Sequence, residues 1–318
     1  MKRKIIKQGN DTLTITLPRK WCQKFCVKAG DEINLEENNN ILMINSDKLK
    51  DSSEIRISFN ELNQQLIWRN IYAAYRSGYD TIRVDFNPKD NYKNIYTCLV
   101  DHREKIIMSS IEVIQDAVSG MQGMVIMDQK KDYCILKDLS EITDKEFDNT
   151  LRRIFFIIEG MGEDTLGLFN EKDKNLVKSI NVADNNIDRF SNYCFRILNR
   201  KGYKTFNKTS VIYSIILILE FIADEYKKVS RHIVELEKSN KLIHSIFENT
   251  NKLFLDFHKT FYNLNNKNMM SLHKDIENLE EKLKSIKLKD KEIEILHHLK
   301  KIKRFIVDLI PLRIEFEL

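Results

Sequence analysis

Two pairs of carboxylates, each spaced four residues apart, are the first feature of this sequence that suggests chemistry. Asp184 and Asp188 form one pair, and Glu220 and Asp224 form the other. Side chains at positions i and i+4 of a helix project from one face, so each pair presents two carboxylates together. Two such helices packed side by side would offer oxygen ligands to a hard cation or to iron. The spacing therefore predicts a metal site at these four residues, with iron or another metal cation as the cofactor.

The same pairs have a simpler interpretation as charge pairs on helix surfaces. Basic residues follow closely in both segments, Arg189 in the first and Lys227 in the second. Glu220 argues against this interpretation because it lies within the apolar run Ile215–Ile222. A carboxylate in apolar surroundings is costly unless it is paired or bound to a cation. The residues alone leave both interpretations open.

A second concentration of charge is basic and lies at the start of the chain. The 318 residues include 52 Lys and Arg against 47 Asp and Glu, a net charge of +5. Residues 1–28 hold eight of the basic residues and a single acid, Asp11, so this segment carries +7 and the rest carries −2. Such a segment is typical of a nucleic-acid-binding surface, with a merely solvated face as the alternative. The predicted DNA-binding residues are Lys2, Arg3, Lys4, Lys7, Arg19 and Lys20.

Other reactive sets are missing from the sequence. It contains no glycine-rich phosphate loop, no G-x-S-x-G motif and no H-E-x-x-H motif, so we expect no catalytic residues and no enzymatic activity. Cys22 and Cys26 are one helical turn apart, but no second pair of ligands lies near them in the sequence. Five cysteines, an odd and small number, fit a reducing compartment. No apolar run approaches the roughly 20 residues of a membrane span, so we expect a cytoplasmic protein without membrane insertion.

The elements that position the basic residues occupy the first 46 residues. Residues 4–16 are expected to form a β hairpin, because polar and apolar residues alternate after a Gly-Asn-Asp turn. Pro18 then opens a short helix, and residues 32–44 form a second pair of strands around a turn at 38–40. A module of this size cannot bury both faces of its strands alone, so it needs a partner.

Two further segments follow, which makes this a multidomain chain. Residues 51–140 are expected to form a small α/β domain, with strands at 54–58 and 81–86, helices at 60–77 and about 89–118, and a hairpin from 124–127 and 133–136. Residues 141–318 are expected to be helical, with helices at 144–169, 171–200, 209–238, 241–266, 268–286 and 289–316. Their similar lengths suggest tandem three-helix bundles, with the carboxylates on the second and third helices. His297 and His298 are expected on the solvated surface of the last helix.

The first 46 residues resemble the AbrB-like (SpoVT/AbrB) swapped-hairpin family. Gly9–Trp21 is similar to the family's G-x-S-x-x-V-T-L-P-x-x-W run, and Val27–Ile33 is similar to its L-x-x-G-D-E-V turn. One departure is Asp11-Thr12, where serine is common in the family. The resemblance implies an intertwined homodimer whose basic face binds double-stranded DNA.

The helical segment resembles PhoU-like proteins. Leu219–Asp224 is similar to their L-E-R-I-A-D segment, and Val182–Arg189 is similar to the E/D-x-x-x-D-R run on the preceding helix. The resemblance extends over about 144–318 and implies tandem three-helix bundles with a metal cluster on the carboxylate face. It also implies a role in phosphate-responsive regulation, through contact with a phosphate-transporter ATPase or a sensor kinase.

The second half of the helical segment departs from the PhoU-like pattern. Lys300 and Arg304 stand where the repeated motif would place acids, although Glu277 and Glu281 keep the acidic spacing on the preceding helix. These residues are expected to pair with one another, so at most one metal site per chain is predicted.

The three segments in this order resemble an archaeal-type phosphate uptake regulator. We therefore expect a DNA-binding transcriptional regulator of phosphate homeostasis, whose helical part senses a metal ion or a partner. The alternative is an adaptor that regulates a phosphate-transporter ATPase or a sensor kinase and uses its head only to dimerise. DNA binding by the basic head separates the two functions.

Overall fold

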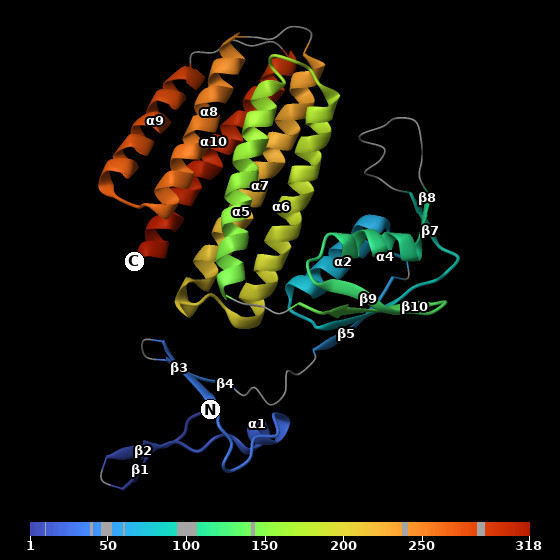
Figure 1. Ribbon diagram of the computed structural model, residues 1–318, viewed down its shortest axis with the longest axis vertical. Helices are drawn as coiled ribbons and strands as arrows, with labels where there is room; N and C mark the ends of the chain where they lie inside the picture. The colour runs from blue at the N-terminus through green and yellow to red at the C-terminus, as the bar shows by residue number, and fades with distance from the viewer. Residues whose placement is uncertain are drawn as a thin grey trace. The chain divides into compact units, whose positions relative to one another are not determined.

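The computed structural model describes residues 1–9, 11–38, 41–45, 53–59, 61–93, 107–140, 144–236, 241–284 and 290–318. Within these residues the chain is mostly helical and contains a few small sheets (Figure 1). It divides into two compact units, Met1–Glu54 and Ile55–Leu318, which we describe separately. The second unit contains both the expected α/β segment and the expected helical segment, and the finer division into three domains stays a prediction.

The head, Met1–Glu54, consists of two hairpins with a short helix between them. Strands β1 (Ile6–Gln8) and β2 (Thr12–Thr14) pair antiparallel, as do β3 (Asn34–Asn38) and β4 (Ile41–Asn45). Helix α1 (Arg19–Lys24) follows Pro18. This order matches the sequence prediction. Asn10, Asn39 and Asn40, in the predicted turns, lie outside the described residues.

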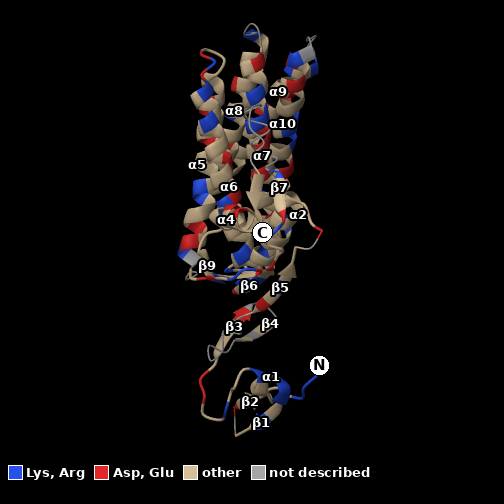
Figure 2. Cartoon of the chain, turned by 90° about the vertical axis from the view of Figure 1, so that its right-hand side faces the viewer, with Lys and Arg blue, Asp and Glu red and all other residues tan. Residues whose placement is uncertain are grey.

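The head has no core of its own among the residues whose burial the structure describes, since none of these is buried. Leu13 is 68% exposed, Ile5 is 67% exposed and Leu35 is 58% exposed. Trp21 of α1 contacts Phe25, which follows the helix, and their ring centroids are 5.4 Å apart. Figure 2 shows Lys and Arg in blue along the segment that leads from the N-terminus and in α1. The described head therefore presents both apolar and basic side chains to solvent.

The α/β layer of the second unit is built on a four-stranded sheet with the order β5-β6-β10-β9. The strands are β5 (Glu54–Ser58), β6 (Thr81–Asp85), β10 (Tyr133–Asp138) and β9 (Met124–Gln129). Strand β10 is antiparallel to both β6 and β9. Helices α2 (Gln64–Arg76) and α4 (Ser110–Ser119) contact each other and lie over the sheet (Figure 1). Ile71, Val84 and Val113 lie in the core between them.

The predicted helix at 89–118 is wrong in its first part, because the described residues 89–93 and 107–109 are not helical. Strands β7 (Asn91–Lys93) and β8 (Ile107–Ser109) pair antiparallel, and α4 begins only at Ser110. Residues 94–106 lie outside the described part of the chain. A capping box explains where the helix starts, because the Ser109 backbone N–H donates to the Glu112 carboxylate at 2.7 Å.

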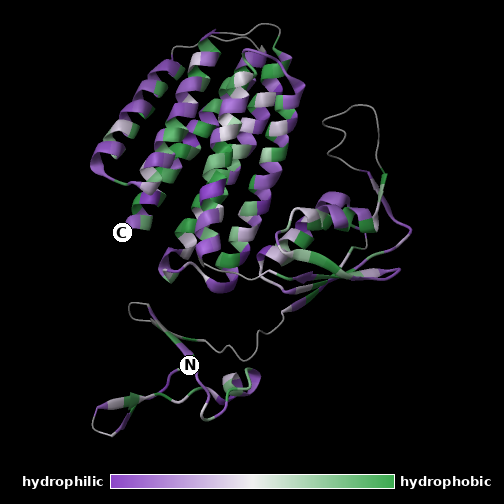
Figure 3. Cartoon of the chain, viewed as in Figure 1, coloured by the Kyte–Doolittle hydropathy of each residue, from purple (hydrophilic) through white to green (hydrophobic). Residues whose placement is uncertain are grey.

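Helices α5 to α10 form an antiparallel bundle. Their bounds are α5 (Asp144–Gly167), α6 (Lys174–Lys201), α7 (Thr209–Glu235), α8 (Lys241–Tyr262), α9 (Asn266–Lys284) and α10 (Asp290–Glu317). Each agrees with a predicted helix to within a few residues. Apolar and polar residues alternate around each helix, as Figure 3 shows by hydropathy.

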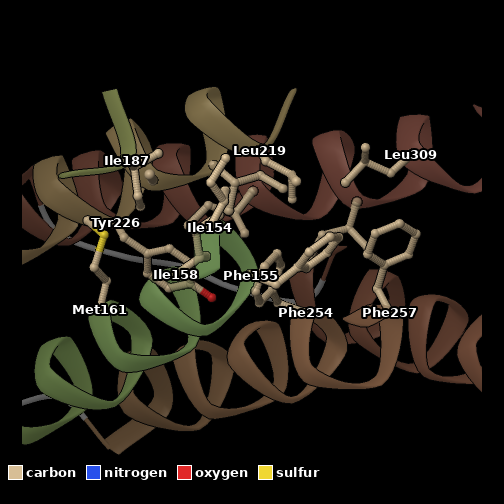
Figure 4. Close-up of a cluster of buried hydrophobic side chains, with 14 of the residues drawn as sticks. Ile154, Phe155, Ile158, Met161, Ile187, Leu219, Tyr226, Phe254, Phe257 and Leu309 are labelled. Carbon is tan, nitrogen blue, oxygen red and sulfur yellow. The ribbon is translucent and has the colours of Figure 1, made fainter. Parts of the chain in front are cut away.

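One continuous apolar core joins helices from both halves of this bundle. Phe155 of α5 packs against Phe254 and Phe257 of α8, and Leu219 of α7 and Leu309 of α10 belong to the same cluster (Figure 4). Helix α7 contacts α5, α6 and α10, which makes it the central helix. The two predicted three-helix sets thus share a core.

Helix α7 also has the length and composition of a membrane span. The segment Phe206–Glu235 passes that test, with 39% of its apolar window buried. The prediction that no run approaches this length is therefore too strict, since it counted only unbroken apolar residues. The central helix of a bundle has the same composition, so one such segment is weak support for a membrane protein.

A buried arginine connects the α/β layer to α6. Arg196 is fully buried, with Nη2 2.8 Å from Asp138 Oδ2 on β10. Its Nη1 donates to the Tyr75 carbonyl oxygen of α2 at 2.7 Å. Burial alone would raise the pKa of Asp138, but hydrogen bonds from Ser140 and the charge of Arg196 hold it below its usual value. The two layers are therefore joined by a desolvated, fully bonded ion pair.

We expect Arg196→Ala to lower the free energy of unfolding by about 3–5 kcal/mol, because it removes the closest cation from the buried Asp138 carboxylate and leaves only Arg200, 3.5 Å away. Chemical denaturation of the full chain measures this loss. The control is Lys204→Ala, which removes a half-exposed pair with Asp148 (3.0 Å) and should cost less than about 1 kcal/mol. Equal losses in the two variants would contradict the structural role of Arg196.

Candidate functional site

The predicted carboxylates meet at the interface of α6 and α7. Asp184 and Asp188 lie on α6, whose first turn is capped by Asp173, which accepts from the Asn175 N–H at 2.8 Å. On α7, polar residues recur at spacings of four, three and four, on one stripe: Glu220, Asp224, Lys227 and Arg231. Arg231 donates to Asn181 of α6 at 3.0 Å, so this stripe faces α6.

Lys227 holds the centre of the cluster. Its Nζ lies 2.5 Å from Asp184 Oδ2 and 2.7 Å from Asp224 Oδ1. Burial would lower the pKa of Lys227, but the charges of Asp184 and Asp224 outweigh burial and raise it. The ammonium therefore stays charged and acts as an internal counterion for two of the four carboxylates.

The other two carboxylates lack such a close cation. Burial raises the pKa of Asp188 to about 8, and the charges of Asp184 and Glu220 add to the effect. Burial also raises the pKa of Glu220, against the opposing charge of Arg76 on α2, whose Nη2 is 4.0 Å from Glu220 Oε1. Glu220 Oε2 is buried, and no hydrogen-bond partner for it occurs in the described part of the chain. At neutral pH, Asp188 therefore holds a proton.

The cluster fits a metal ion in chemistry but not in geometry. Four carboxylates with one unpartnered oxygen suit a hard cation. However, within the described ranges no three of their oxygens converge to within 4.8 Å of one another, and the Lys227 ammonium lies where the ion was expected. As placed, these residues hold a lysine instead of a metal ion.

The corresponding face of α9 and α10 is organised differently from the prediction. Glu277 pairs with His273 on its own helix, with 3.5 Å between His273 Nε2 and Glu277 Oε1. Arg304 pairs with Asp308 at 3.1 Å. Lys300 is exposed, and the contact between the two helices is made by Lys303 and Glu280. The predicted pairing of Glu277 and Glu281 with Lys300 and Arg304 is therefore not found.

The sequence prediction missed a second polar cluster on α7. Glu225 lies next to Asp224 but faces α10, where its Oε2 is 2.5 Å from His298 Nδ1. His297 is exposed as predicted, whereas His298 is buried, so its predicted place on a solvated surface is wrong. The signal was present in the sequence: His298 lies three residues after Ile295 and four before Ile302, on the apolar seam itself.

The predicted DNA-binding residues all lie in the head, and their side chains are exposed: Lys2, Arg3, Lys4, Lys7, Arg19 and Lys20. Lys7 belongs to β1, and Arg19 and Lys20 form the first turn of α1. No ion pair with a described carboxylate involves any of the six. Their charges are therefore free to meet an external anion.

Comparisons with known protein families, with characterised proteins and with solved structures find no match for this chain. The function must therefore be argued from the residues and their geometry. Two features carry that argument, the exposed basic and apolar head and the charged interface between α6 and α7.

In protein freed of divalent ions with a chelator, we expect Asp188 to contribute a fall in the free energy of unfolding as the pH rises from about 4 to 8. The folded state keeps the Asp188 proton up to about pH 8, whereas the unfolded chain releases it near its ordinary pKa of 3.8. The folded state thus binds one more proton in this window, and this group contributes a slope of up to about 1.4 kcal/mol per pH unit.

Chemical denaturation of Asp188→Asn across this pH range tests this contribution of Asp188. The free energy of unfolding of the variant should change less with pH than that of the wild type. Asp308→Asn, at a more exposed carboxylate on α10, should keep the wild-type slope. If the free energy of unfolding of Asp188→Asn changed with pH as steeply as that of the wild type, the raised pKa could not belong to Asp188.

Proposed function

We propose that this protein is a DNA-binding transcriptional regulator that dimerises through its head and responds to a partner or an ion through the unit Ile55–Leu318. The observation that carries the proposal is the state of the head. None of its residues with a described burial is buried, and they expose apolar side chains of the strands together with six basic side chains. The resemblance of residues 1–46 to AbrB-like proteins supports the same assignment.

The exposed apolar residues of the head argue for a second copy of this chain as their cover. Leu13 lies on β2, Leu35 on β3 and Leu42 on β4, and all three are exposed. An isolated two-stranded hairpin is marginally stable in water, so each needs additional strands to pack against. A two-fold pairing of identical heads supplies them, because each apolar strand finds its complement in the other copy.

The basic residues then give the dimer its target. Two heads present twelve such side chains, six from each chain, whereas residues 29–318 carry a net charge of only −2. Contacts of Lys and Arg with DNA phosphates release counterions and supply affinity without sequence information. Duplex DNA is therefore the partner that this charge distribution fits best.

The helical part supports a role in phosphate homeostasis through its resemblance to PhoU-like proteins. Contact with a phosphate-transporter ATPase or a sensor kinase in the cytoplasm is the corresponding proposal. The cluster at α6 and α7 offers a physical means of response, since Glu220 lies near Arg76 of the α/β layer. Iron or another cation at Asp184, Asp188, Glu220 and Asp224 would have to displace Lys227.

The competing function is an adaptor whose head only dimerises. It is favoured by the same apolar exposure, which requires a partner copy and does not by itself require DNA. The two proposals differ in one measurable property, namely affinity for duplex DNA at physiological salt. Two experiments separate dimerisation from DNA binding.

Leu13→Glu tests dimerisation in the full chain. Leu13 is 68% exposed in a single copy, so a charge there leaves the isolated chain intact but opposes burial in a dimer. We expect the variant to sediment as a monomer where the wild type sediments as a dimer. Met270→Glu, at a residue of α9 that is also 68% exposed, is the control and should stay dimeric. A dimeric Leu13→Glu variant would place the interface elsewhere.

The double variant Arg19→Ala, Lys20→Ala tests DNA binding. Sequences bound by the wild type are first selected from genomic DNA at fixed salt, and affinity is then measured at several salt concentrations. Each lost phosphate contact should lower the slope of log affinity against log salt by about 0.9, so four lost contacts per dimer lower it by about 3–4. The control Lys274→Ala, Lys300→Ala removes the same charge from exposed positions on α9 and α10 and should bind normally.

A dimer that binds no duplex DNA, or a head variant that binds as tightly as the wild type, would count against the regulator. The first of these results would support the adaptor.

A further inference from the structure

A line of polar residues crosses the apolar contact between α7 and α10. The two helices run antiparallel, since Lys291 Nζ donates to the Glu235 carbonyl oxygen at 3.2 Å and Lys208 Nζ donates to that of Glu315 at 2.9 Å. Polar residues recur on the facing stripes at spacings of three and four. We call this set the α7–α10 polar seam: Glu225, Lys228, His232 and Glu235 on α7, and Lys291, Glu294, His298 and Lys301 on α10.

Three residues of the seam converge as a set of metal ligands. One ligand atom each from His232, Glu294 and His298 lies within 4.8 Å of the other two. The imidazole rings of His232 and His298 lie nearly parallel, with centroids 5.4 Å apart and an interplanar angle of 18°. Glu294 precedes His298 by one turn of α10. Two imidazoles and a carboxylate are the donor set of an open zinc site.

The second observation is the partner behind His298. Its Nδ1 is 2.5 Å from Glu225 Oε2, which leaves the opposite ring nitrogen, Nε2, for a metal. A carboxylate that accepts from the far nitrogen of a ligating histidine fixes the ring orientation and strengthens the ligand. Glu225 is only 4% exposed and is held by Lys228, whose Nζ is 2.8 Å from Oε1.

We propose that the α7–α10 polar seam binds one divalent transition-metal ion of the zinc type through His232, Glu294 and His298, with a fourth position open to water. The nitrogen donors select this class over Mg²⁺ and Ca²⁺, which prefer oxygen ligands. The bound ion ties α7 to α10 and so stabilises the bundle by mass action.

This site is separate from the carboxylate cluster. Asp224 and Lys227 face α6, whereas Glu225 and Lys228 face α10. His232 lies eight residues beyond Asp224, about 12 Å along the helix axis. The proposal therefore stands or falls independently of the function proposed above.

Zinc titration of the full chain tests the proposal. The protein carries no affinity tag, is stripped with a chelator, and is titrated with Zn²⁺ against a chromophoric competitor. We expect one equivalent per chain and a higher midpoint of thermal unfolding. His232→Gln and Glu294→Gln, at positions that are not fully buried, should each weaken binding at least 10-fold and abolish the thermal shift. Glu225→Gln should weaken binding by about 10–100-fold, as loss of a carboxylate behind a metal-bound histidine does.

Two matched controls distinguish the site from adventitious binding. His297→Gln removes the exposed neighbour on α10, and His244→Gln removes one member of a helical pair with Glu248, and both should bind like the wild type. Circular dichroism establishes that each variant keeps its helix content. If a histidine variant unfolds, the zinc affinity of Glu294→Gln tests the site instead. The proposal is overturned if the wild type binds no zinc, if His232→Gln and Glu294→Gln bind like the wild type, or if binding is lost instead in Asp188→Asn and Asp224→Asn.

Discussion

Burial of charge along α7 is the constraint on which the arrangement of the helical part depends. This helix is the central one of the bundle, with contacts to α5, α6 and α10, yet it carries carboxylates on two stripes. A desolvated carboxylate is tolerated only beside a cation or several hydrogen-bond donors. Each stripe therefore meets a neighbour of complementary charge: Lys227 pairs with the buried Asp184 of α6, and Glu225 pairs with His298 of α10. Apolar packing would allow these helices to slide or rotate, but the polar contacts select one register.

The two stripes of α7 differ in how their charge is balanced. At the α6 interface an ammonium and a proton compensate the carboxylates, so the cluster depends on pH and on competing cations. At the α10 interface a carboxylate orients an imidazole, and the result is a set of nitrogen and oxygen ligands that face one another. Adjacent residues of one helix thus produce two kinds of site, because each side chain turns by about 100° around the helix axis relative to the one before.

The head differs from the rest of the chain in how its apolar residues are covered. The unit Ile55–Leu318 completes its cores within one chain, and buried Arg196 joins its sheet to its bundle. In the head, none of the residues whose burial is described is buried, and Leu13, Leu35 and Leu42 of its strands are exposed to water. The proposed regulatory function rests on this contrast, because it requires the unit Ile55–Leu318 to act on the dimer that the heads are proposed to form.

The sequence by itself determined whatever depends on neighbours along the chain. The bounds of α5 to α10, the hairpin–helix–hairpin order of the head, and the placement of Asp184, Asp188, Glu220 and Asp224 on two helix faces all follow from local periodicity and from helix-breaking residues. Only the tertiary structure decided what those faces meet. Lys227 rather than a metal ion bridges Asp184 and Asp224, His298 is buried against Glu225, and residues 91–93 pair as a strand with 107–109. Periodicity indicates which side of a helix is buried, but the charge that compensates a buried group comes from another element, whose register is set by packing.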